Sequence, residues 1–138
     1  MSQIRHLSGR IWEKLLKESG VDVFNGAQGR ILYILWEHGD LTISEIGKLT
    51  SLAKTTLTSM LDRMEAGGLI ERVPDKKNRR QIFIVVTEKA KEYRDKYDWL
   101  SDKMSEAYYR GFSETEVKEF EDKLRKIVKN LETEESNI

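Results

Sequence analysis

The sequence predicts a mainly α-helical fold with one small antiparallel pair of strands. Apolar residues recur at helical spacing along most of the 138 residues. Two runs rich in β-branched residues, 69–73 and 81–86, are separated only by a short charged stretch. Two short helical segments directly precede them. The helices should therefore form the body of the protein, with the strand pair as a small appendage.

The first two helices are predicted from apolar spacing and from their stop signals. The first covers residues 1–20, where apolar residues recur every three or four positions and Gly20 supplies a stop. The second runs from about Ala27 to Glu37 and is broken near Gly39.

Two further helices follow at close spacing. The shorter one begins at a capping box, in which Thr42 and Glu45 satisfy each other's free backbone donors. Ser51 is expected to cap the next helix, and Gly67-Gly68 closes it. The buried stripe of this second helix is predicted to be Leu57, Met60, Leu61 and Met64.

The strand pair and its loop complete a recognisable pattern. The loop carries paired arginines, and Pro74, the only proline, lies where the first strand leaves the ladder. Two helices followed by such a hairpin are typical of a winged helix-turn-helix, here spanning residues 27–87. We treat the whole chain, 1–138, as a single unit built around this lobe.

The remaining helices are predicted to join two copies of the chain. A long helix is expected after Thr87, Ser113 begins another at a second capping box, and residues 133–138 are expected to fray. Segments 1–20 and 88–134 carry more apolar surface than one small domain needs to cover, which predicts dimerisation helices and a homodimer. The alternative is a three-helix bundle within one chain.

Composition excludes several classes of function. The chain has no cysteine, which rules out disulfides and thiolate metal sites. His6 and His38 lack metal-binding spacing, so neither a metal nor a cofactor is expected. No catalytic motif is present, so we predict no enzyme. Without a signal peptide or a run near the ~20 apolar residues of a membrane span, we predict a cytoplasmic protein with no membrane partner.

Charge is segregated along the chain although the net charge is zero. Residues 53–87 hold seven lysines and arginines against four acids, whereas residues 113–138 hold eight acids against five bases. This segregation suits a module that meets phosphates on one side. We therefore predict double-stranded DNA as the partner. The alternative is a winged-helix protein-interaction module without specific DNA readout.

The helix that follows Ser51 has an unusual outward face. Hydroxyl side chains stand where strong helix formers are usual, and short hydroxyls can approach base edges or phosphates closely. The alternative is an ordinary core helix. The predicted DNA-binding residues of this recognition helix are Ser51, Lys54, Thr55, Thr56, Thr58, Ser59 and Arg63.

The basic loop is either a solubilising hairpin tip or a DNA-binding wing. For a wing, we predict that Arg79 enters the minor groove and that Asp75 orients Arg79 or Arg80. The remaining basic residues would contact phosphates. The predicted wing residues are Asp75, Lys76, Lys77, Asn78, Arg79 and Arg80.

These segments resemble the multiple antibiotic resistance regulator (MarR) family of bacterial transcription factors. The matching stretches are LTISEIGKLT, SLAKTTLTSMLDRMEAGGLIERV and PDKKNRRQIFIVVTEKA, and the similarity extends over nearly the whole chain. Asn78 stands where an aspartate is common, and Ala90 where a glycine is common. The resemblance implies a homodimeric repressor whose terminal helices interlock while two winged lobes bind successive major grooves of a near-palindromic operator.

The same resemblance implies a small-molecule effector pocket between the dimer helices and the DNA-binding lobe. Aromatic side chains would line it, and an arginine would face an anionic effector. The alternative is that the aromatic residues only pack in the core and at the interface. The candidate residues are Arg10, Trp12, Arg30, Tyr33, Trp36, Tyr93 and Tyr97.

Overall fold

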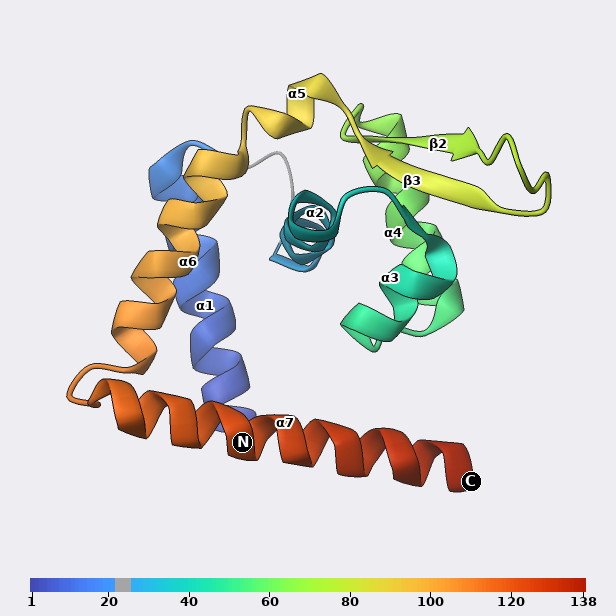
Figure 1. The fold of residues 1–138 in the computed structure, drawn as a ribbon. Helices are drawn as coiled ribbons and strands as arrows, with labels where there is room; N and C mark the ends of the chain where they lie inside the picture. Colours follow the sequence, from blue (N-terminus) through green and yellow to red (C-terminus); the bar gives the residue numbers. More distant parts are fainter. Residues whose placement is uncertain (22–25) are drawn as a thin grey trace. The chain divides into compact units, whose positions relative to one another are not determined.

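The predicted fold class, mainly α with a small antiparallel sheet, is confirmed by a computed structural model that describes residues 1–21 and 26–138 (Figure 1). The chain divides into two compact units, residues 1–104 and 105–138. In chain order the elements are α1 (Ser2–Ser19), α2 (Gly26–His38), β1 (Leu41–Thr42), α3 (Ile43–Thr50), α4 (Lys54–Ala66), β2 (Ile70–Pro74), β3 (Ile82–Val86), α5 (Glu88–Lys91), α6 (Arg94–Tyr108) and α7 (Glu114–Asn137).

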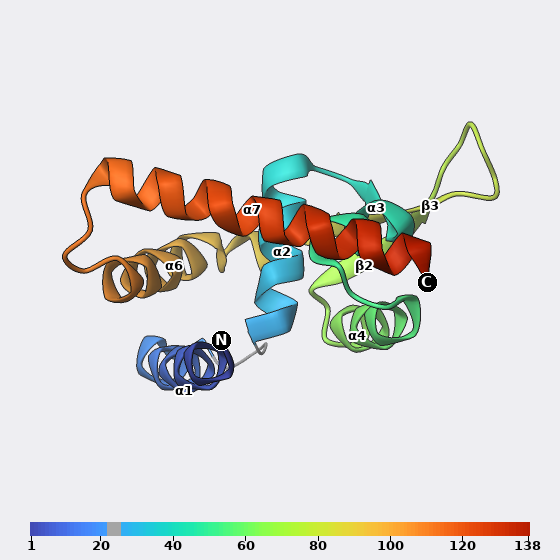
Figure 2. The same ribbon diagram turned by 90° about the horizontal axis from the view of Figure 1, so that it is seen from below.

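The sheet has three strands instead of the two predicted. β3 lies in the middle, with β1 and β2 antiparallel to it on either side. β2 and β3 pair along their whole lengths, and the loop between them extends beyond the ladder (Figure 2). β1 is only Leu41–Thr42, paired with Ile84 and Phe83, and two residues are too few to show strand periodicity in the sequence.

The core of the first unit lies between α2, α3, α4 and the sheet. The stripe predicted on α4 is confirmed, because all four of its residues are buried. Burying one large apolar side chain is worth roughly 1.5–3 kcal/mol, so this stripe fixes which face of α4 points outward. Other fully buried core residues include Ile31, Leu32, Ile46, Ile70 and Ile84.

The capping box at the start of α3 is present as predicted. The Thr42 hydroxyl accepts a hydrogen bond from the Glu45 backbone N–H at 3.2 Å, and the Glu45 carboxylate accepts one from the Thr42 N–H at 3.2 Å. Ser113 and Glu116 form the corresponding box at the start of α7.

Thr42→Ala is expected to lower the free energy of unfolding by about 1 kcal/mol, the usual loss when a capping side chain is removed. Urea unfolding followed by circular dichroism would measure the change. Ser44→Ala, an exposed change in the same helical turn, is the control and should have little effect. Equal stability of Thr42→Ala and the unaltered protein would contradict the importance of the cap.

The prediction that Ser51 caps the recognition helix is wrong. Ser51 instead ends α3 in a left-handed conformation, with φ of 59°, and its N–H donates to the carbonyl of Gly47. Leu52 then packs against the core, which leaves Ala53 as the residue before α4, with no side-chain cap. Packing of Leu52 therefore decides the geometry of this turn.

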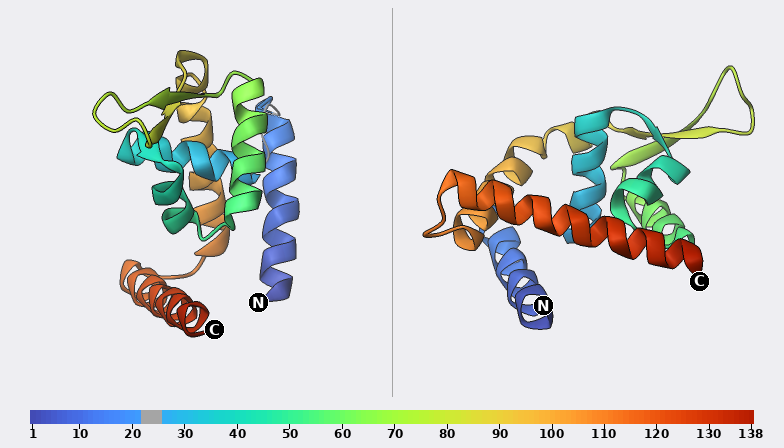
Figure 3. Two further views of the ribbon diagram at one scale, coloured as in Figure 1. Left: turned by 90° about the vertical axis from the view of Figure 1, so that its right-hand side faces the viewer. Right: turned by 60° about the horizontal axis from the view of Figure 1, so that its bottom comes forward.

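The C-terminal third differs from its prediction in two places. The long helix expected after Thr87 is divided into α5 and α6 by a turn at residues 92–93, where the Tyr93 N–H donates to the Ala90 carbonyl at 3.0 Å. Thr87 ties the end of the sheet to the start of α5. Its hydroxyl donates to the Gly68 carbonyl at 2.6 Å and accepts from the Ala90 N–H at 3.3 Å. Residues 133–137, expected to fray, continue α7 as an unbroken helix (Figure 3). In the described residues, no helix is long and apolar enough to cross a membrane.

Candidate nucleic-acid interface

The outward face of α4 carries most of the residues predicted to contact DNA. Its surface is hollowed into a shallow, open depression. The residues that line this depression are Lys54, Thr55, Thr58, Ser59 and Asp62. Thr56 and Arg63 are exposed on α4 outside this set, and Ser51 is exposed in the preceding turn. The structure therefore brings together four of the seven predicted residues and adds Asp62, which was not among them.

The loop between β2 and β3 is shaped by hydrogen bonds from side chains to the backbone. The Asp75 carboxylate accepts from the Lys77 N–H at 2.9 Å, and the Asn78 side-chain oxygen accepts from the Arg80 N–H at 3.1 Å. The Asp75 N–H closes the loop onto the carbonyl of Gln81 at 3.0 Å. Asp75 was expected to orient the Arg79 or Arg80 side chain, but the bond found orders the loop backbone. Asn78, which stands where the family that the sequence resembles commonly has an aspartate, forms a similar bond to the loop backbone.

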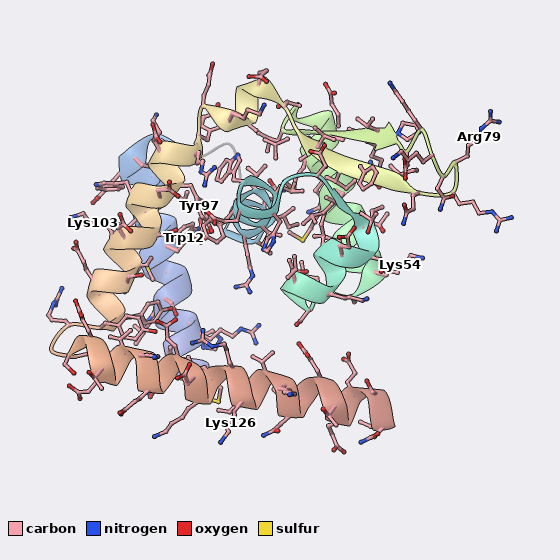
Figure 4. The ribbon with its side chains drawn as sticks, viewed as in Figure 1. Trp12, Lys54, Arg79, Tyr97, Lys103 and Lys126 are labelled. Carbon is pink, nitrogen blue, oxygen red and sulfur yellow. The ribbon has the colours of Figure 1, made fainter. Side chains whose placement is uncertain are left out.

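Positive charge gathers at the tip of this loop. Lys76, Lys77, Arg79 and Arg80 are all exposed, and no acidic side chain among the described residues forms an ion pair with them. Arg79 extends away from the strand ladder, and Lys54 lies at the start of α4 (Figure 4). Side chains that have no intramolecular partner are available to phosphates or to a groove.

A clamp between α4 and β2 was missed by the sequence interpretation. The guanidinium of Arg72 donates to Glu65 at 2.7 Å and to Asp62 at 2.8 Å. The Arg72 backbone N–H also donates to Glu65 at 3.2 Å. Partial burial works to lower the pKa of Arg72, but the hydrogen bonds and charges of Glu65 and Asp62 outweigh it and raise that pKa. The clamp joins the helix that carries the depression to the strand that leads into the basic loop.

Strand alternation contains a signal for this clamp. Ile70 is buried and Glu71 exposed, so Arg72 returns to the inward side of β2. A charged residue at an inward position requires a partner. Asp62 and Glu65, one helical turn apart on the neighbouring helix, supply it.

Four of the seven residues predicted for an effector pocket form an aromatic cluster. The Tyr97 ring lies 5.5 Å from that of Trp12, 5.8 Å from Tyr33 and 5.7 Å from Trp36, measured between centroids. Burial raises the pKa of Tyr97, against the opposing effects of a hydrogen bond with Ser101 and the charge of Arg30. These spacings are those of directly packed rings, which favours the packing alternative for the rings themselves.

The other candidates lie around this aromatic cluster. Tyr93 packs against the main core, whereas Arg10 and Arg30 are exposed. Among the described residues, the indole N–H groups of Trp12 and Trp36 are buried without a hydrogen-bond acceptor. No group of three or more potential metal ligands occurs in the described part of the chain.

Comparisons with known proteins agree with this architecture. A model of the MarR family matches residues 24–82. The HTH-type transcriptional regulator TtmR of Methylorubrum extorquens is 35% identical over 95 residues, which make up 69% of this chain and 47% of that protein. The HTH-type transcriptional repressor IacR of Pseudomonas putida is 28% identical over 121 residues, covering 88% of this chain and 71% of that one. The chain thus spans about half the length of the first of these relatives.

A solved structure extends the likeness over the whole fold. Reduced AbfR bound to DNA superimposes with a TM-score of 0.73 and 27% identity, over 94% of this chain and 87% of that one. The sequence match, the order of elements and this superposition agree with one another. Over residues 24–82, the chain belongs to the MarR family.

Proposed function

We propose that this protein is a sequence-specific DNA-binding transcriptional regulator that acts as a homodimeric repressor. The observation that carries the proposal is the pairing of the hydroxyl-lined face of α4 with an unpartnered basic loop on the same unit. The face suits contact with base edges in a major groove, and the loop suits phosphates and the adjacent minor groove. The similar AbfR structure contains DNA, and the relative IacR is a repressor.

Salt dependence tests DNA binding directly. The probe is a labelled duplex from upstream of the protein's own gene, titrated with the full chain between roughly 50 and 200 mM salt. The logarithm of the binding constant should fall linearly with the logarithm of salt concentration, because each neutralised phosphate releases counterions. Excess duplex of random sequence should compete poorly. Failure to bind duplex DNA at low salt would refute the proposal.

The alternative, a winged-helix module that binds only proteins, makes a different prediction. Such a module has no need for unpartnered arginines on the wing. It would bind the upstream duplex and random duplex equally weakly. Strong preference for one sequence therefore separates the two functions. Our proposal places the protein in the cytoplasm and assigns it no enzymatic activity.

Dimerisation is supported by the second unit taken by itself. α7 is 24 residues long and has no buried side chain, yet it carries an apolar stripe at helical spacing. The exposed members are Phe120, Leu124, Ile127, Val128 and Leu131. An uncovered apolar stripe of this length marks an interface. We propose that a second copy of the chain covers it, with residues 1–20 and 88–134 acting as dimerisation helices.

We also propose that a small aromatic or anionic effector acts near the aromatic cluster. Two buried indole N–H groups lack acceptors among the described residues, and Arg30 is close enough to Tyr97 to affect its pKa. An anionic ligand could accept from the indoles and pair with the arginine. Titration of the protein with benzoate should quench the tryptophan fluorescence and weaken operator binding. Trp36→Phe should reduce both effects. Equal quenching in Trp36→Phe would place the ligand elsewhere.

A further inference from the structure

Asp62 differs chemically from its neighbours on the outward face of α4. It lines the same depression as Lys54 and the hydroxyl residues, but an ionised carboxylate only accepts hydrogen bonds. Its side chain is 64% exposed. A surface that meets phosphates does not normally tolerate an acid, since like charges repel.

The ion pair with Arg72 offsets the repulsion between Asp62 and phosphates. The guanidinium of Arg72 lies 2.8 Å from one carboxylate oxygen, Oδ1, of Asp62, and the Arg72 side chain is only 22% exposed. The positive charge therefore stands behind the carboxylate, on the side of β2, while the carboxylate remains at the surface. The ion pair balances the charge of Asp62 and limits the directions in which its oxygens can point.

The second acid of the clamp provides a comparison within the same structure. Glu65 uses both of its oxygens, one for the Arg72 guanidinium and the other for the Arg72 backbone N–H. It does not line the depression. Asp62 uses only Oδ1, and its other oxygen, Oδ2, has no partner among the described residues. Glu65 is thus committed to the clamp, whereas Asp62 retains an acceptor at the surface.

We propose that Asp62 is a specificity-determining residue that accepts a hydrogen bond from the exocyclic amino group of a cytosine in the major groove, with Arg72 as its positioning residue. The proposal rests on the proposed function, in which α4 occupies that groove. Among base edges in the major groove, the cytosine N4 amino group is the donor that pairs with aspartate or glutamate. The hydroxyls beside Asp62 can donate or accept and discriminate less. Asp62 therefore selects cytosine at one base pair in each half-site.

Selection from a randomised duplex pool tests the assignment. The full-length protein should enrich a motif with a cytosine at one position of each half-site. Asp62→Asn removes the charge, keeps the shape, and offers the donor and acceptor pair that suits adenine. It should shift that position alone from cytosine to adenine. Glu65→Gln, the matched control in the same clamp, should keep the cytosine. An unchanged motif in Asp62→Asn would overturn the proposal.

A second measurement uses the unaltered protein and is independent of variant folding. Each cytosine of the selected site is replaced in turn by N4-methylcytosine, which keeps its base pair but blocks the amino hydrogen in the major groove. One replacement per half-site should weaken binding by about 5- to 150-fold, the range of a single mismatched base pair. The same replacement should have little effect on Asp62→Ala. If no methylated cytosine weakens binding, the assignment of Asp62 is wrong.

These outcomes separate the inference from the function on which it rests. A pool in which the unaltered protein enriches no sequence refutes specific DNA binding altogether. A clear motif that is indifferent to Asp62→Asn refutes only the role of Asp62. For the positioning role, Arg72→Gln should broaden the preference at the cytosine position while the rest of the motif persists. Uniform weakening at every position would make Arg72 merely structural.

Discussion

Replacing Arg79 with alanine is expected to weaken operator binding by about 1–3 kcal/mol for each wing, the usual loss for a groove contact. The side chain extends from the tip of the loop (Figure 4), and no acidic partner for it exists among the described residues. Its removal should therefore leave the fold intact and cost only contacts with DNA. Fluorescence anisotropy titrations with a labelled operator would measure the loss.

Two further variants separate the shape of Arg79 from its charge. Arg79→Lys keeps the charge but loses the planar guanidinium, so it should recover only part of the affinity. Lys96→Ala removes one positive charge from the exposed surface of α6 and should bind as the unaltered protein does. If Arg79→Ala binds operator DNA with unchanged affinity, Arg79 is not a groove contact. If Lys96→Ala loses as much, the effect reflects net charge and not the wing.

The features that were predicted correctly depend on residues close together in the sequence. The capping box of Thr42 and Glu45 needs only a spacing of three residues, and it is present. The buried stripe of α4 follows from helical periodicity alone. Gly68 takes the left-handed conformation expected after α4. In each case the local pattern and the tertiary packing favour the same conformation.

The features that were missed depend on contacts between distant segments. β1 exists because Leu41–Thr42 lies beside β3, more than forty positions later in the chain. Arg72 reaches back to α4 for its carboxylate partners. Ser51 has a side chain that could cap a helix. Because Leu52 packs against the core, however, Ser51 ends α3 and does not start α4. Local propensity is a weak prior at such positions because tertiary contacts outweigh it.

The exposure of most candidate DNA-binding residues was predicted from the sequence, but the hydrogen bonds that shape the loop were not. Hydroxyl and basic side chains do line the exposed face of α4 and the loop tip. Asp75 and Asn78, however, order the loop through backbone N–H groups of Lys77 and Arg80. Short polar side chains commonly form such turns with residues two positions ahead. The acidic residue in this basic loop, Asp75, therefore indicates how the loop backbone is shaped more than how the arginine side chains are oriented.

The second large effect is expected from α7. Replacing Leu124 and Ile127 together with glutamate places two charges in the exposed apolar stripe and should convert the proposed dimer to a monomer, because burying unpaired charges is costly. A monomer contacts one half-site at a time. Losing the link between two such sites lowers the overall affinity by roughly 10²–10⁴-fold. Sedimentation velocity and operator titration would measure the two changes.

Lys126→Glu is the control because residue 126 lies on the opposite side of α7 from the stripe at 100° per residue. It changes the charge of α7 as much as both replacements together, yet it should leave the dimer and operator affinity unchanged. Circular dichroism should show that all variants keep their helices. A Leu124→Glu, Ile127→Glu protein that remains dimeric would refute α7 as the interface. A helical monomer that still binds full operator tightly would refute the dependence of affinity on paired lobes.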